Sequence, residues 1–145
     1  MKKLLTLAAL LVVGAVLQAG PAPSGWMTDF VSAQRNAQEG NRPMLLLFTG
    51  SDWCGWCIKL HKDVLSRPAF KRFAVSKKLL LVYLDFPRGP QPEELKAQNR
   101  ELARKFNVRG YPTTIVLAPD GRELGRMPGY AKDYINRLNK ILREQ

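Results

Sequence analysis

The chain has 145 residues, enough for one domain with a proper hydrophobic core and too few for two ordinary domains. Apolar residues make up 46% and charged residues 24%, a globular composition that excludes a disordered or repetitive chain. The formal net charge is +11, but no nucleic-acid-binding motif accompanies it, so we expect no nucleic-acid partner. This charge is compatible with a solvated basic surface. It is also compatible with a surface that attracts anionic membranes or acidic partners.

The N-terminal segment differs from the rest of the chain. Lys2 and Lys3 precede an almost wholly apolar run from Leu4 to Leu17, and small residues follow around Ala19. This pattern predicts a signal peptide over residues 1–19, followed by a linker over residues 20–27. An uncleaved N-terminal membrane anchor is the alternative. We therefore expect an exported protein, periplasmic or secreted, in an oxidising compartment where thiols need an external source of electrons.

The pattern of predicted strands and helices after the linker indicates one α/β domain over residues 28–145. Strands separated by helices favour parallel neighbours, and the Pro119-Asp120-Gly121 turn favours a final antiparallel hairpin. We expect a sandwich with a mixed central sheet of about four strands and helices on both faces. The predicted elements are helix 28–38, strand 44–48, a helix starting at the cysteines, helix 68–75, strand 79–84, helix 93–106, strand 113–117, strand 123–126 and helix 131–143.

The two cysteines of the chain, Cys54 and Cys57, follow an apolar strand pattern and begin a helical one. A thiol on the first turn of a helix is favoured as thiolate by the macrodipole and by unpaired N–H groups, so we expect a pKa below the free value of about 8.5. Residues three apart share a helix face, within the Cα window of about 4.4–6.8 Å that a disulfide needs. The pair therefore predicts thiol–disulfide exchange. The inward positions expected on this helix are Ile58, His61, Val64 and Leu65.

Two motifs carry a resemblance to a known family. Trp53-Cys54-Gly55-Trp56-Cys57 follows a buried strand, and Gly110-Tyr111-Pro112-Thr113 precedes a later one. With Gly129 before the last helix, the chain from about Pro43 onward resembles thioredoxin-fold proteins. It is most similar to exported thioredoxin-like proteins and to the periplasmic C-terminal domain of DsbD-type thiol:disulfide interchange proteins.

The resemblance implies an oxidoreductase without a cofactor. Cys54 would be the nucleophile and Cys57 the resolving thiol, and Pro112 would follow a cis peptide bond that places the Tyr111 backbone beside the thiols. Trp53, Trp56, Tyr111 and Pro112 would then contact substrate. The partners implied are protein or peptide disulfides and an upstream thiol redox partner, for which a membrane protein is one candidate. We expect a monomer.

The sequence departs from its relatives around the thiols. Thioredoxins place a buried acid six residues before the first cysteine, where this chain has Phe48, and the lysine opposite that acid falls on or near Tyr83. DsbD-type domains have a glutamate four residues after the second cysteine, where this chain has His61. A lone helical histidine is a packing or surface residue in one interpretation and a proton acceptor for Cys57 in the other.

Two other function classes remain open. Cys54, Cys57 and His61 have the soft ligand chemistry of a Cu(I) or Zn site, so a copper-binding metallochaperone is the alternative. The notable point against it is that the helix supplies only three ligands. A non-catalytic peptide-binding module of the same fold is the third interpretation, against which the intact pair of cysteines argues.

Overall fold

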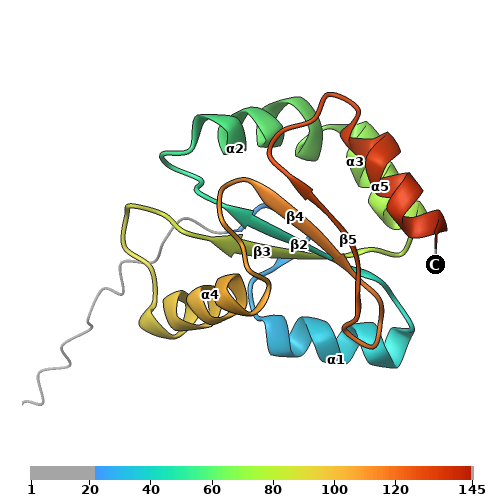
Figure 1. Ribbon diagram of the computed structural model, residues 1–145, viewed down its shortest axis with the longest axis horizontal. Coiled ribbons are helices and arrows are strands. Elements are labelled where there is room, and N and C mark those ends of the chain that lie inside the picture. The colour runs from blue at the N-terminus through green and yellow to red at the C-terminus, as the bar shows by residue number, and fades with distance from the viewer. Residues whose placement is uncertain (1–21, 145) are drawn as a thin grey trace, which may run out of the picture.

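The computed structural model describes residues 22–144 (Figure 1), so the predicted signal peptide lies outside the described part of the chain. None of the helices within residues 22–144 has the length and apolar character needed to cross a membrane. The elements are β1 (Trp26–Met27), α1 (Phe30–Gly40), β2 (Met44–Thr49), α2 (Gly55–Leu60), a π-helix η1 (His61–Leu65), α3 (Pro68–Ser76), β3 (Leu80–Asp85), α4 (Glu93–Lys105), β4 (Thr113–Leu117), β5 (Glu123–Pro128) and α5 (Tyr134–Arg143).

Five strands form one mixed sheet in the order β1-β3-β2-β4-β5. β1 and β2 lie parallel to β3, whereas β4 is antiparallel to both β2 and β5. The sheet has one strand more than expected, because Trp26 and Met27, inside the predicted linker, pair with Leu81 and Val82. Two residues carry too little periodicity to predict such a strand from sequence.

Helices cover both faces of the sheet. Figure 1 shows α1 and α4 on one face and α2, α3 and α5 on the other. β2 is buried along its whole length, so its alternate side chains enter two different cores. One core, with α1 and α4, includes Phe30, Ala33, Leu46, Phe48, Leu102 and Phe106. The other, with α2, α3 and α5, includes Leu45, Leu47, Leu60, Val64, Phe70 and Leu138.

The cysteine helix changes its winding after Leu60, where α2 passes directly into η1. Contrary to the predicted inward face, the Ile58 side chain is 48% exposed, and Leu60 is fully buried. Val64 and Leu65 are buried as expected. Ile58 lies in the regular helix α2, before η1, where each residue turns the side chain by about 100°. A buried face through Cys57, Leu60 and Val64 therefore leaves Ile58 outside it.

Candidate active site at the start of the cysteine helix

Cys54 and Cys57 form a disulfide across the first turn of α2, with Cα atoms 5.2 Å apart. Cys54 is the N-cap residue, and its Sγ accepts the Cys57 backbone N–H at 3.3 Å. The Gly50 N–H points at Cys57 Sγ from 3.4 Å. Both cysteines are buried, Cys57 more deeply, with 3% exposed against 7% for Cys54. Backbone N–H groups therefore face both sulfur atoms, an arrangement that stabilises negative charge on them.

The loop before β4 lies against Cys54. The Tyr111–Pro112 peptide bond is cis, and the Tyr111 carbonyl oxygen is 3.6 Å from Cys54 Sγ. The Gly129 N–H donates to the Pro112 carbonyl at 2.7 Å, which ties this loop to the end of β5. The structure thus brings together the two sequence motifs, although more than fifty residues separate them along the chain.

Trp53 forms a wall beside the thiols. Its Nε1–H donates to the Phe86 carbonyl at 2.7 Å, and its ring meets Tyr111 edge-on with centroids 6.0 Å apart. The Arg88 guanidinium lies 5.6 Å from the centroid of the same ring. The ring is therefore held from several sides, and it remains 39% exposed. This combination suits a residue that both shields the pair and contacts a docked chain.

Gly50 leaves room for that ring. A Cβ at this position would lie 2.6 Å from Trp53 Cε2, whereas one at Gly55 would meet nothing within 4 Å. We expect Gly50→Ala to lower the free energy of unfolding by about 1–3 kcal/mol, because the anchored ring cannot move aside freely. Gly55→Ala is the matched control and should be neutral or slightly stabilising. Urea unfolding measures both, and equal stability of the two variants would contradict the packing described.

Trp56 projects from the other side of the pair, with 61% of the residue exposed. Its ring stacks on Tyr130 with centroids 5.8 Å apart. The Tyr130 hydroxyl donates to Asp63 at 3.2 Å, and Lys59 lies over the Tyr130 ring and pairs with Asp63. Tyr130 is a site residue that the sequence analysis missed. Tyr130 directly follows Gly129, which is one of the residues that carry the family resemblance, and this position could have identified it.

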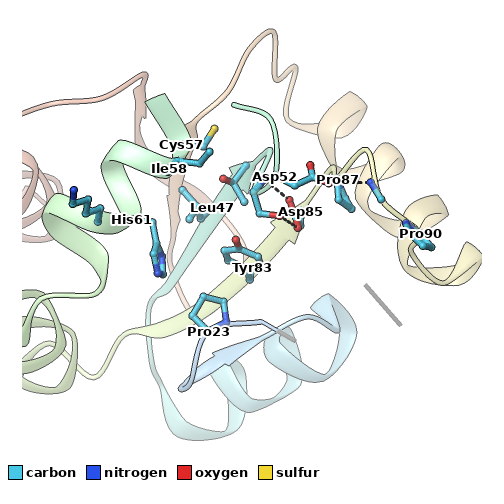
Figure 2. A pocket seen from close by; sticks show the side chains of 14 residues that line it. Pro23, Leu47, Asp52, Cys57, Ile58, His61, Tyr83, Asp85, Pro87 and Pro90 are labelled. Atoms are coloured by element: carbon cyan, nitrogen blue, oxygen red, sulfur yellow. Dashed lines mark hydrogen bonds between the residues drawn. The ribbon is translucent and has the colours of Figure 1, made fainter. Parts of the chain in front are cut away.

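A pocket of about 490 Å³ lies beneath the cysteine helix. Cys57 and His61 line it from the helix, and Leu47, Tyr83 and Asp85 line it from the sheet (Figure 2). Within the described residues the His61 side chain has no hydrogen-bond partner. It is half-buried and enters the same pocket as Cys57, one helical turn further along.

Phe48 stands six residues before Cys54, but its side chain does not lie beneath the thiols. Its side chain packs in the core with α1 and α4, on the opposite face of the sheet from the cysteine helix. Leu47 lies beneath that helix, with Tyr83 beside it in register on β3. The interpretation of Phe48 is therefore corrected to Leu47, because the turn between β2 and α2 breaks the simple count. Leu47 is not acidic either, so the strand position beneath the thiols still carries no carboxylate.

Burial raises the pKa of Tyr83 to about 12, with a further contribution from the negative charge of Asp85. A side-chain hydrogen bond between Tyr83 and Ser51 acts in the opposite direction. Tyr83 therefore stays protonated at neutral pH, and it supplies a hydroxyl rather than a base to the pocket. Proton transfer to or from Cys57 consequently depends on other groups.

Asp85 is the second residue that the sequence analysis missed. Its carboxylate accepts the Ser51 backbone N–H at 2.9 Å and the Ser51 hydroxyl, and it lines the pocket below Cys57. A polar residue at the carboxyl end of a buried parallel strand is the signal that would have identified it. Nearby, Asp52 accepts the Arg88 and Gly89 N–H groups, and these bonds lower its pKa. Asp52 thus anchors the loop after β3, while Cys54 caps the helix.

The family model that describes a thioredoxin-like domain matches residues 30–145. The chain belongs to the thioredoxin-like family. Among curated proteins, the chain is 36% identical over 119 residues to the disulfide bond reductase DsbH of Chlamydia pneumoniae, covering 79% of this chain and 71% of DsbH. It is 33% identical to the thioredoxin-related protein DsbJ of the same organism, over 81% of this chain and 34% of DsbJ.

Solved structures agree with this assignment. A DsbH oxidoreductase superposes with a TM-score of 0.74 at 31% identity, covering 97% of this chain and 96% of that one. A thioredoxin from Thermus thermophilus gives a TM-score of 0.60 at 25% identity, over 79% of this chain and 82% of its own. With the Cys54–Cys57 pair at disulfide distance, the chain is a thioredoxin-like disulfide oxidoreductase.

Proposed function

We propose that the chain is exported and exchanges disulfides with protein substrates, on the reductase or isomerase side, with Cys54 attacking and Cys57 resolving. The observation that carries the proposal is the position of Cys54 Sγ, at the start of α2 and 3.6 Å from the Tyr111 carbonyl. The similarity to a protein named as a disulfide bond reductase supports the reductase side. The apolar segment before Gln18 supports export.

The proposed reaction moves two electrons from the dithiol to the substrate. The Cys54 thiolate attacks one sulfur of a substrate disulfide, so that a mixed disulfide forms and one substrate thiolate leaves. Cys57 then loses its proton and attacks Cys54 Sγ, which forms the Cys54–Cys57 disulfide and releases the second substrate thiolate. An upstream thiol partner returns two electrons to the pair, and a membrane protein is one candidate for it.

We place the substrate segment along the Tyr111–Pro112 loop. The contact between the Tyr111 carbonyl and Cys54 supports an extended chain lying beside this loop. Hydrogen bonds between the two main chains would bind it with little dependence on its sequence. The partly exposed rings of Trp53 and Trp56 border the thiols on either side and offer apolar contact. Arg109 lines a separate hollow together with Tyr111 and Pro112.

His61 is the proposed proton acceptor for Cys57. It shares the pocket below Cys57, and its imidazole is of the chemical type that exchanges protons near neutral pH. We expect His61→Ala to slow resolution of the mixed disulfide by about tenfold while leaving its formation within about twofold of the parent rate. Stopped-flow kinetics with a fluorescent disulfide peptide separates the two steps.

His61→Gln is the control for packing, since it retains a polar side chain of similar reach without a titrating group. It should show the same slow resolution as His61→Ala. If both variants resolve the mixed disulfide at the parent rate, His61 is a packing residue. The resolution rate against pH adds a second readout, because a group that only packs leaves this profile unchanged.

The cellular test of the proposed function uses the exported chain carrying Cys57→Ser. This variant should accumulate mixed disulfides with protein substrates, because the thiol that would release them is absent. The same experiment with Cys54→Ser should capture none. The redox state of the parent chain in cells gives the direction of electron flow. A mainly reduced pair is expected, and a fully oxidised pair at steady state would contradict the reductase side.

The geometry does not favour the copper alternative. Among residues 22–144, no three Cys, His, Asp or Glu side chains are grouped so that they could hold a metal ion. Cys54 and His61 therefore do not converge on one site, although both contribute chemically suitable atoms.

A further inference from the structure

The helix α3 presents a face without acidic residues. From Val64 to Leu84 the sequence contains neither Asp nor Glu. Lys71 lies on α3 and Lys78 lies just beyond its C-terminal cap, and both line the same hollow. Arg67 is the N-cap residue of the same helix. By contrast, the basic residues of α4 and α5 include members paired with acids, such as Lys96 with Glu93 and Arg137 with Asp133. The positive charge on α3 is therefore locally uncompensated.

A hollow of about 440 Å³ lies on this face. Arg42, Lys71 and Lys78 line it, and none of these three forms an ion pair with a residue in the described range 22–144. The Arg42 guanidinium donates to the backbone carbonyl of Lys78 at 2.9 Å, which holds this cation at the edge of the hollow, next to the residue that carries the Lys78 side chain. Three positive charges around one hollow, of which the Arg42 guanidinium is held by hydrogen bonds, suit a phosphate group.

The hollow also has an apolar component. Ala74, Leu79 and Leu81 line it, and Val75 stands beside them with 78% of the residue exposed, more than any other large hydrophobic residue among those described. The apolar face of α3 packs in the core through Phe70 and Ala74, so Val75 is the apolar side chain of this helix that can enter the headgroup region beside the cations. Cations alone would suit any anion, whereas this combination favours an anionic lipid.

The start of the described chain lies at the same place. Ser24 and Gly25 line the hollow, and they follow the predicted export segment 1–19 by only a few residues. A chain still attached to a bilayer through that segment would carry the hollow only a few residues from the lipid. The thiols lie at the N-terminal end of α2 and α3 lies beyond its C-terminal end (Figure 1), so this contact leaves them free for substrate.

We propose that Arg42, Lys71, Val75 and Lys78 form a docking face for the anionic surface of a phospholipid bilayer. Headgroup phosphates lie between the three cations, and Val75 reaches toward the acyl boundary. Lipid binding through this face is peripheral and electrostatic, so it weakens as salt increases. The proposal is independent of the redox function, because it uses no residue of the thiol site.

The test measures cosedimentation with vesicles by the chain from Gly20 to Gln145, which contains every residue of both core clusters. At about 50 mM salt it should bind phosphatidylcholine vesicles that contain about 30% phosphatidylglycerol, and pure phosphatidylcholine vesicles at least tenfold more weakly. Lys71→Glu combined with Lys78→Glu should lower binding to the anionic vesicles by about tenfold or more.

Arg100→Glu combined with Arg104→Glu is the matched control, since it changes the net charge equally on α4, across the sheet from α3. It should retain most of the binding. Lys71→Gln with Lys78→Gln, which removes charge without reversing it, should lose binding in part, and urea midpoints verify folding. The proposal would be overturned if the parent chain did not bind anionic vesicles, or if both glutamate variants lost binding equally. Binding of the parent to polyglutamate but not to vesicles would also overturn it.

Discussion

Replacing Cys54 with serine should abolish disulfide reduction, because a serine hydroxyl does not attack a disulfide sulfur. We expect the rate of exchange to fall by more than about 100-fold. Replacing Cys57 with serine should give a different result, in which the first step proceeds and the reaction stops at a mixed disulfide on Cys54. The measurement is a single-turnover reaction of the reduced chain with insulin, without added reductant, followed by non-reducing mass spectrometry.

The two serine variants control for each other, since both remove one thiol and prevent the internal disulfide. Any difference between them therefore reports the roles of the cysteines and not the loss of the bond. Release of reduced insulin chains by the Cys57→Ser variant, in the absence of other thiols, would contradict a resolving role for Cys57. An adduct on Cys57 in the Cys54→Ser variant, formed at the parent rate, would contradict the order of attack.

Phe48→Ala should have the largest effect on stability among core substitutions near the site. Phe48 is fully buried, and its ring meets Phe106 edge-on with centroids 6.4 Å apart. Truncating a buried phenylalanine removes apolar contact and leaves a cavity, so we expect a loss of about 3–5 kcal/mol in the free energy of unfolding. Urea denaturation measures this loss, which is a large part of the stability of an ordinary domain.

Disulfide exchange by the folded fraction of the same variant should be nearly unchanged, because Phe48 lies across the sheet from the thiols. Phe48→Leu is the control that retains most of the apolar volume, and it should cost clearly less. Slower resolution in the folded Phe48→Ala variant, with little change in stability, would mean that Phe48 acts on the thiols and that its placement in the α1 and α4 core is wrong.

Most of the fold could be predicted because its elements carry strong local signals. The apolar runs of β2 and β4 are of strand length, and Pro68 and the Pro119-Asp120-Gly121 turn punctuate the chain at the right places. Asp29 caps α1 by accepting the Val31 and Ser32 N–H groups, a role of the residue type that begins helices. β1 was missed because its stability comes from pairing with β3, a partner distant in sequence.

The thiols and the Tyr111–Pro112 loop could be predicted because each is a contiguous motif. The groups around them could not, since they meet only in three dimensions. Whether Leu47 or Phe48 faces the cysteine helix depends on the path of the turn between β2 and α2, which periodicity does not describe. Asp85 reaches the pocket from the end of β3, and its contact with Ser51 joins residues that are far apart along the chain.

The central claim is that Cys54 is the nucleophile and Cys57 the deeper, resolving thiol. Limiting iodoacetamide added to the fully reduced chain at neutral pH tests it most directly, with peptide mass spectrometry to locate the modification. Cys54 should be alkylated about tenfold or more faster than Cys57, because reactivity follows thiolate character and access, and Cys57 is the more buried of the two. Alkylation of Cys57 at an equal or greater rate would contradict the account.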